Sequence, residues 1–300
     1  MLGKLIKNSL KSNASSVYNT YIAMGIIGVI MLILMLVDWT KWGERGVGTG
    51  LAIKVAASAA LCITAFIGVI LTFVSVFGEF ERSMYSREGQ LTLTLPVKSS
   101  SLLLAKWFSG SFWVILSYTA LCICAFGSML YLIRHSMGVI EDNADYSNIY
   151  YLVTEMVRQL SDAAGINAPS LKVIGNLAFL YSISGAIRAC VFVLLVYFAV
   201  TLSHVRPFSK LGKIGKILYF FAGFFVVQTL SSLVTKLIKI YVIVSETAFT
   251  LSTSDADVRL AWDNGFGAFS ITSVYITTVL AVVVFLLTTL LIDRKVNVDS

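Results

Sequence analysis

Long apolar runs constrain this chain more than any other feature of its sequence. A helix of about 20 residues crosses the hydrocarbon core of a bilayer, and apolar runs of about 18 or more residues indicate such helices. We therefore predict six transmembrane helices, at residues 17–37, 55–77, 102–133, 171–203, 214–235 and 269–292. The third and fourth runs are longer than a bilayer needs, so we expect these helices to tilt or to project beyond it.

The amino-acid composition leads to the same class of protein. Of the 300 residues, 57% are hydrophobic and only 13% are charged, whereas a soluble domain carries about 25% charged residues. Too little polar surface remains to cover a globule in water. We predict an all-α polytopic membrane protein, with residues 1–300 forming a single transmembrane domain.

The basic residues gather in alternate connections, and this bias predicts the orientation of the chain. Taken together, the N-terminal segment, the second–third and fourth–fifth connections with the first turns of the runs that follow them, and the C-terminal tail carry 13 lysines and arginines against 5 acidic residues. These segments, and both termini, are therefore predicted to be cytoplasmic. Because the basic residues are divided among short loops, we expect contacts with anionic membrane lipids and no binding of nucleic acid.

Three connections carry further predictions. Residues 1–16 have an apolar and a basic face, which favours a helix lying in the inner membrane interface over a disordered basic tail. Residues 134–170 form an outer loop that contains an amphipathic helical pattern. Residues 236–268 are polar, but they lack the dense oxygen ligands of a calcium loop, so we predict a solvated loop.

The sequence contains no catalytic or metal-binding pattern. Its histidines, His135 and His204, fall at opposite edges of the predicted bilayer, and neither has a carboxylate at metal-ligand spacing. Phosphate-loop, zinc-protease and nucleophile-elbow motifs are also absent from the sequence. We therefore predict a non-catalytic chain with no metal site.

A charged residue inside one apolar run is a candidate functional residue. Arg188 lies well within the fourth run, and charges at membrane depth are costly and often functional. The alternative is that Arg188 lies only about five residues deep in a core of about 20 residues, so that its long side chain extends outward to water. Lys236 and Lys239, at an outer helix end, are predicted to have no special role.

Uncharged polar residues inside the runs are weaker candidates. Gln228 and Ser232 occur in the fifth run, and Thr64 and Thr72 occur in the second. Side chains of this kind usually form hydrogen bonds between helices. The alternative is that they line a path for a substrate.

The connection at residues 78–100 is the most informative segment. Phe80, Met84 and Tyr85 share one helical face and Arg82 lies on another, so the second span is predicted to continue as an amphipathic cytoplasmic helix. After this helix, the sequence LTLTLP alternates apolar and polar residues. Since no other cytoplasmic segment resembles a strand, we predict an extended linker whose leucines face a partner protein or the membrane.

This segment also carries a resemblance to a known family. The stretch FERSMYSREGQLTLTLPVKSSSLLLAKWFSG, residues 80–110, resembles the first cytoplasmic connection of bacterial ABC transporter permeases of the type-2 exporter class. The matching positions are Arg82, Tyr85, Glu88, Gly89, Leu91, Thr92, Leu95, Pro96 and Lys106. The chain differs from the family at residues 236–268, where many members have apolar re-entrant helices.

The resemblance implies a half-transporter in the bacterial cytoplasmic membrane. Two permease subunits, identical or different, would form the pathway, and separate ABC ATPase subunits would bind beneath them. ATP and Mg²⁺ would be held by the ATPase, so this chain would bind no cofactor itself. Neither the substrate nor the direction of transport follows from the residues, and export is implied by the resemblance alone.

Under the same resemblance, residues 78–100 couple the ATPase to the membrane helices. Arg82, Arg87 and Glu88 would make polar contacts with the ATPase, while Tyr85 and Leu91 would pack in its groove. The full implied docking set is Phe80, Arg82, Tyr85, Arg87, Glu88, Gly89, Leu91, Leu95 and Pro96. The alternative function is a non-transporting membrane scaffold or sensor-associated protein that binds a cytoplasmic partner through this segment.

Overall fold

Long helices dominate the structure, which is a computed structural model. It describes residues 2–36, 46–85, 99–137, 170–205 and 212–299, together with Arg158, Asp162 and Asn167. The long helices are α1 (Leu2–Leu36), α2 (Gly46–Tyr85), α4 (Ser99–Met137), α6 (Leu171–Ser203), α7 (Gly212–Leu237) and α9 (Ile271–Asp299). Within the described residues, 5 helical segments are long and apolar enough to cross a membrane: Ile53–Tyr85, Ser99–Ala125, Lys172–Ser203, Ile214–Leu237 and Ile271–Asp293. These segments confirm the predicted class of membrane-embedded helical protein.

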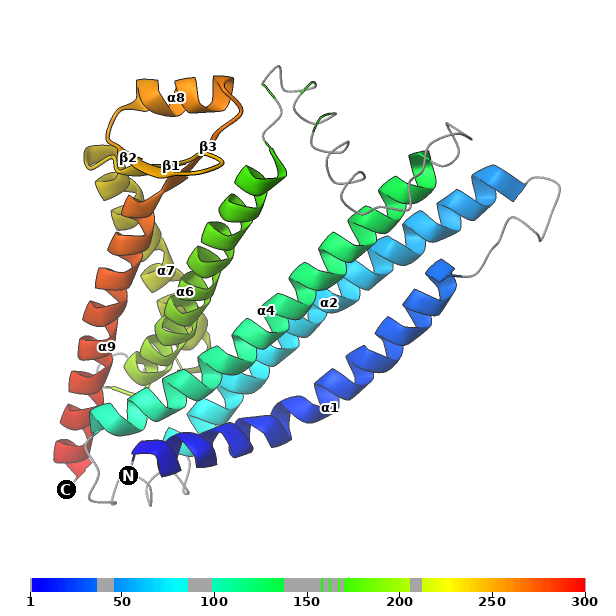
Figure 1. The fold of residues 1–300 in the computed structure, drawn as a ribbon. Helices are drawn as coiled ribbons and strands as arrows, with labels where there is room; N and C mark the ends of the chain where they lie inside the picture. Colours follow the sequence, from blue (N-terminus) through cyan, green and yellow to red (C-terminus); the bar gives the residue numbers. More distant parts are fainter. Residues whose placement is uncertain are drawn as a thin grey trace.

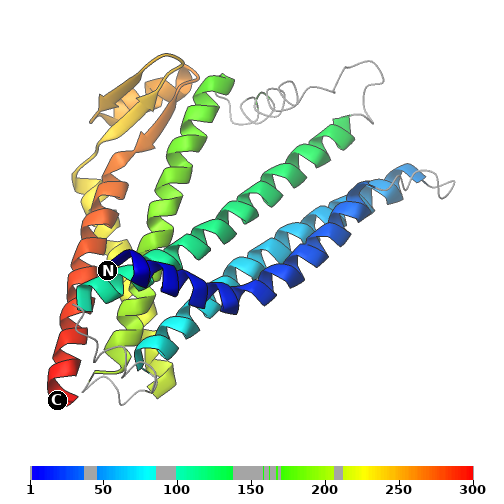
Figure 2. The same cartoon turned by 60° about the horizontal axis from the view of Figure 1, so that its bottom comes forward.

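The long helices form two groups that meet at one end of the molecule. Helices α1, α2 and α4 pack together, and helices α6, α7 and α9 pack together. Figures 1 and 2 show that the groups converge where both termini lie and diverge toward the opposite end. We call the converging end the closed end and the opposite end, which carries a small β-sheet, the sheet end.

A buried apolar cluster holds the two groups together at the closed end. We call it the closed-end core, and its buried members are Val76, Phe80, Met84, Leu102, Leu103, Val114, Val193, Val196, Tyr197, Val200 and Ile292. They come from α2, α4, α6 and α9. Gly110 of α4 permits this close approach, because a Cβ atom there would lie only 2.8 Å from Cγ1 of Val76.

The predicted interfacial helix at residues 1–16 and the start of the first predicted span form one unbroken helix, α1. Its N-terminal turns cross the closed end before the helix runs along α2 (Figure 1). Ser12 donates a hydrogen bond to Glu79 of α2, and Asn13 Nδ2 donates to Ser109 Oγ of α4 over 2.8 Å. These polar contacts attach the N-terminal turns of α1 to the other two helices of its group.

The connection at residues 236–268 is not the solvated loop that we predicted. It contains strands β1 (Tyr241–Val244) and β2 (Phe249–Ser252) and helix α8 (Asp255–Asp263). Strand β3 (Gly267–Ser270) follows and completes an antiparallel sheet of order β2-β1-β3. The last long helix therefore begins at Ile271, two residues after the predicted start of its span.

Burial of one face of the sheet explains this correction. Val242 and Val244 alternate with more exposed residues along β1 and pack against Val173 of α6. The ring of Phe269 in β3 meets Tyr181 of α6 edge-on, at a centroid distance of 5.1 Å. The part of α6 at the sheet end thus supports the sheet, which accounts for its length of 33 residues.

Two predicted features fall largely or wholly outside the described residues. The amphipathic helix was expected within residues 134–170. Of this range, the structure describes only the last turn of α4 and a few single residues. The alternating leucine segment and its flanking Gly89 and Pro96 lie within residues 86–98, which the structure does not describe.

Candidate functional site

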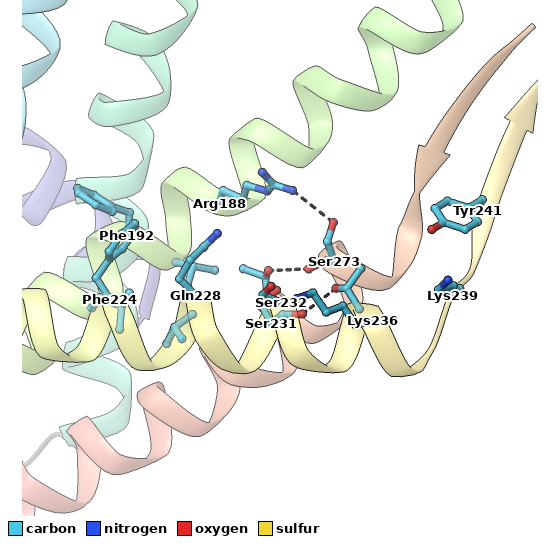
Figure 3. A pocket seen from close by; sticks show the side chains of 15 residues that line it. Arg188, Phe192, Phe224, Gln228, Ser231, Ser232, Lys236, Lys239, Tyr241 and Ser273 are labelled. Atoms are coloured by element: carbon cyan, nitrogen blue, oxygen red, sulfur yellow. Dashed lines mark hydrogen bonds between the residues drawn. The ribbon is translucent and has the colours of Figure 1, made fainter. Parts of the chain in front are cut away.

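A partly open cavity of about 570 Å³ lies among α6, α7, α9 and the start of β1 (Figure 3). The aromatic and aliphatic side chains in its lining come from α6 and α7: Val191, Phe192, Leu195, Phe224 and Val227. The polar side chains are Arg188, Gln228, Ser231, Ser232, Thr235, Lys236, Lys239, Tyr241, Ser273 and Thr277. Among these described lining residues, three are cationic and none is acidic.

One face of α7 forms much of the lining. The positions follow helical spacing from Phe224 through Gln228 and Ser232 to Lys236, with Lys239 just beyond the helix end. Along this face the side chains change from aromatic to neutral polar and then to cationic. The α7 side of the cavity therefore changes from aromatic to cationic along the helix, with its lysine at the sheet end.

Arg188 extends from α6 into the same space. Its guanidinium Nη2 donates a hydrogen bond of 3.3 Å to Ser273 Oγ, in the first turn of α9 (Figure 3). The Ser273 hydroxyl in turn donates to the Ser270 carbonyl over 3.2 Å, which leaves its lone pair for the arginine. Arg188 lies in the middle of α6, and its guanidinium reaches the first turn of α9.

Lys239 differs from the other two cations because it has a carboxylate partner. It forms an ion pair with Asp255 at the start of α8, and Tyr241 Oη donates a hydrogen bond of 3.2 Å to the same carboxylate. The hydrogen bond with Lys239 lowers the pKa of the Asp255 carboxyl, and the same bond raises the pKa of Lys239. By contrast, among the described residues neither Arg188 nor Lys236 has a carboxylate within ion-pair distance.

The structure brings together three of the candidate residues from the sequence: Arg188, Gln228 and Ser232. It also places Lys236 and Lys239 in the lining, to which the sequence assigned no special role. Sequence reasoning treated each residue separately. The signal that it missed was the continuous face of α7, on which Lys236 follows Gln228 and Ser232 at helical spacing.

Thr64 and Thr72 lie in α2, in the other helix group, and do not line this cavity. Thr72 is fully buried; its hydroxyl donates to the Gly68 carbonyl over 2.8 Å and accepts from Ser117 Oγ of α4 over 2.9 Å. Thr64 Oγ1 donates to the Ala60 carbonyl of its own helix over 2.8 Å. Thr72 thus has a hydrogen bond between helices, whereas the bond of Thr64 stays within α2.

The described residues of the implied docking set lie at the end of α2. Phe80 is only 1% exposed, and its ring stacks on Tyr197 of α6 with a centroid distance of 3.8 Å and an interplanar angle of 7°. The ring of Tyr85 stacks on His204, just after α6, at 4.1 Å. Both aromatic rings therefore contact α6 or its end, and in this conformation the buried Phe80 side chain presents no surface to a partner.

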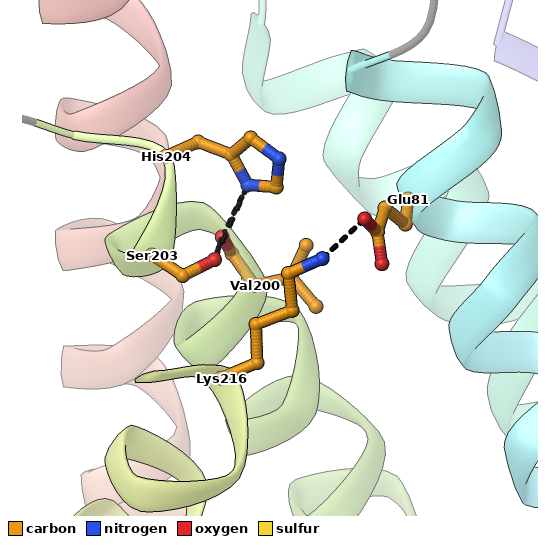
Figure 4. Close-up of polar contacts among 5 residues, drawn as sticks. All are labelled: Glu81, Val200, Ser203, His204 and Lys216. Atoms are coloured by element: carbon orange, nitrogen blue, oxygen red, sulfur yellow. Dashed lines mark hydrogen bonds and ion pairs between the residues drawn. The ribbon is translucent and has the colours of Figure 1, made fainter. Parts of the chain in front are cut away.

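Polar contacts lie beside these rings at the surface of the closed end (Figure 4). Lys216 of α7 forms an ion pair with Glu81 of α2, which joins the two helix groups. His204 Nδ1 donates to the Val200 carbonyl over 2.9 Å. An open hollow of about 270 Å³ is lined by Gly78, Glu81, Arg82, Tyr85 and His204.

The rest of the implied docking set lies outside the described residues: Arg87, Glu88, Gly89, Leu91, Leu95 and Pro96. Their docking role stays a prediction. Comparisons of the chain with protein-family models, with curated proteins and with solved structures found no match. The functional argument therefore depends on the geometry of the cavity and of the closed end.

Proposed function

We propose that this chain is the permease subunit of an ATP-driven exporter, and that a separate ABC ATPase supplies the energy. The observation that carries the proposal is the cavity of about 570 Å³ among α6, α7 and α9. A polar, cationic space is costly among apolar membrane helices. It is therefore better explained by a solute that enters it than by packing alone. The sequence resemblance at residues 80–110 supports the ATPase as the partner.

The arrangement of the helices supports a transport cycle. The two groups make their main contacts at the closed end, where Phe80 stacks on Tyr197 and Lys216 pairs with Glu81. Helices joined at one end can rotate as rigid bodies about that contact. Because the proposed coupling segment, residues 78–100, begins within α2, movement of the ATPase would be transmitted to the closed-end core.

The full topology belongs to the same proposal. The sixth span would be α1, in which the described residues contain the shorter apolar segment Val17–Ile30. The closed end, with both termini, would face the cytoplasm, and the sheet would face the outside. The permease would act as a dimer, with a second copy or a related subunit beside it.

Co-purification tests the partner. The tagged chain, extracted from its native membrane in mild detergent, is expected to recover a soluble ATPase. The double variant Arg82→Glu and Arg87→Glu should lose that ATPase, because charge reversal opposes the proposed polar contacts. A matched control is Lys172→Glu with Arg259→Glu, which reverses two exposed charges at the sheet end.

Two outcomes would contradict the proposal. If the folded chain is recovered from its membranes without any ATPase, the proposal that an ATPase supplies the energy would be contradicted. Recovery of an ATPase that shows no stimulation by any solute in proteoliposomes would favour the non-transporting scaffold instead.

A further inference from the structure

The three cations of the cavity are not equivalent, and this asymmetry points to a ligand. Lys239 is neutralised by Asp255, whereas Arg188 contacts only the neutral Ser273 hydroxyl among the described residues. No described residue supplies an anion to Lys236 either. Two positive charges therefore face the same cavity without a carboxylate partner among the described residues.

The guanidinium of Arg188 has N–H donors available for a ligand. A guanidinium has five N–H donors in a fixed plane, and the Ser273 contact uses one nitrogen. Figure 3 shows Arg188 and Gln228 on opposite walls, with Ser232 and Lys236 further toward the sheet end. Arginine binds carboxylate and phosphate groups through paired N–H donors. The charged end of the cavity is thus suited to an oxyanion.

The opposite end of the cavity has a different chemistry. Phe192 and Phe224 form a wall there, with ring centroids 6.1 Å apart in an edge-on arrangement (Figure 3). Val191, Leu195 and Val227 continue the apolar lining. A small hydrated anion would leave this half unused, and a neutral lipid would leave the two cations uncompensated.

We propose that this cavity binds an anionic amphiphile, with its oxyanion headgroup between Arg188 and Lys236 and its apolar chain along Phe192 and Phe224. The volume of about 570 Å³ falls within the roughly 300–1,000 Å³ of ligand pockets. It accommodates a headgroup and the first part of an acyl chain. An anionic amphiphile would then be the substrate class of the proposed exporter. Only its transport rests on the exporter function, since binding itself requires no ATPase.

Binding to the purified full-length chain in detergent micelles tests the inference. Native mass spectrometry would compare dioleoyl phosphatidylglycerol, which is anionic, with dioleoyl phosphatidylcholine, which is zwitterionic. We expect the anionic lipid to bind more tightly. Arg188→Gln and Lys236→Gln should each weaken its binding by about fivefold, the effect expected for one cation near an anionic headgroup.

Control variants separate loss of the site from loss of the fold. Lys172→Gln removes an exposed lysine of α6 that does not line the cavity, and it should leave binding unchanged. Lys236 lies near the exposed end of α7, so the Lys236→Gln variant provides a test even if the Arg188→Gln variant fails to fold. Arg188→Lys keeps the charge and should retain more binding than Arg188→Gln.

Inorganic phosphate and glycerol 3-phosphate, added as competitors, distinguish a lipid from a free anion. If both compounds compete only weakly with the anionic lipid, the result supports binding of an amphiphile, because neither compound fills the apolar half of the cavity. Competition as strong as that of the intact lipid would overturn the amphiphile and leave a site for small anions. Equal binding of the two lipids, or equal loss in the Lys172→Gln control, would overturn the site altogether. None of these results depends on an ATPase, so failure of the exporter proposal would be seen separately.

Discussion

Replacement of Phe80 by alanine tests whether this residue belongs to the closed-end core or to a docking surface. The side chain is 1% exposed and stacks on Tyr197 at 3.8 Å. Truncation of a buried phenylalanine costs about 3–5 kcal/mol in protein cores. The surrounding residues come from several long helices, so the site cannot collapse easily, and we expect a loss of about 4 kcal/mol.

Thermal unfolding of the purified chain in nanodiscs would measure this loss. Trp107 packs against the closed-end core and provides an intrinsic fluorescence signal near the substitution. The midpoint should fall by about 10 °C if each kcal/mol lowers it by 2–4 °C. The matched control is Phe66→Ala, which removes the same side chain from the same helix at a position that is 56% exposed. Its expected effect is within about 0.5 kcal/mol.

Equal midpoints of thermal unfolding for Phe80→Ala and Phe66→Ala would refute the assignment of Phe80 to the closed-end core. That result would mean that Phe80 contributes little within the chain, as expected for a residue whose main contact is an ATPase. A selective loss for Phe80→Ala would instead assign any ATPase contact in this region to the exposed side of α2, where Arg82 lies.

Two further predictions concern the closed end and the sheet end. Gly110→Ala should destabilise the chain by about 1–3 kcal/mol, because the new Cβ would lie 2.8 Å from Cγ1 of Val76. Gly78→Ala, where a Cβ meets nothing within 4 Å, should raise the unfolding midpoint, and the reverse order would contradict this account of packing. At the sheet end, we expect acid to destabilise α8. The hydrogen bond with Lys239 holds the pKa of Asp255 below its ordinary value of 3.8. The ionised carboxylate therefore contributes stability above pH 3.8, and this contribution is lost as the pH falls through the lowered pKa. Protection factors of the α8 amides, which correct for the slower intrinsic exchange in acid, should therefore fall as the pH is lowered; Asp255→Asn should remove that dependence, and an unchanged acid response in the variant would exclude this ion pair as its cause.

The helices were predictable because their lengths and apolar faces are local properties of the sequence. The fourth run was predicted at residues 171–203, and α6 spans Leu171–Ser203. The helix of the second run was also predicted to continue beyond Phe77, and α2 extends to Tyr85. A long, mainly apolar run indicated α6 and an amphipathic pattern indicated the continuation of α2, before any tertiary contact was considered.

The sheet was not predictable by the same means. Each of its strands has 4 residues, and strand patterns as short as these carry little periodic signal. The pairing of β1 with β3 joins residues that are separated by α8, as in Val242 with Phe269. What stabilises the sheet is the burial of Val242 and Val244 against α6, and this contact is distant in sequence.

The candidate site shows the same division between local and distant information. The positions of Arg188 and Gln228 were notable in the sequence, because each interrupts an apolar run. Their convergence depends on how α6 packs against α7 and α9, which the sequence pattern does not specify. Thr72 looked similar to Gln228 in the sequence, yet it faces Ser117 of α4 instead.

Helix α6 connects the cavity to the closed end, and this connection gives the proposed transport cycle a physical route. Arg188 and Tyr197 are nine positions apart on one unbroken helix, a rise of about 13 Å. Between them, the Cys190 carbonyl accepts a hydrogen bond of 2.8 Å from Trp107 Nε1 of α4. A movement of α4 relative to α6 must therefore either break this bond or carry the cavity wall with it. Because Phe80 joins α2 to the same stretch of α6, a displacement at the end of α2 would reach Arg188 through a single rigid element.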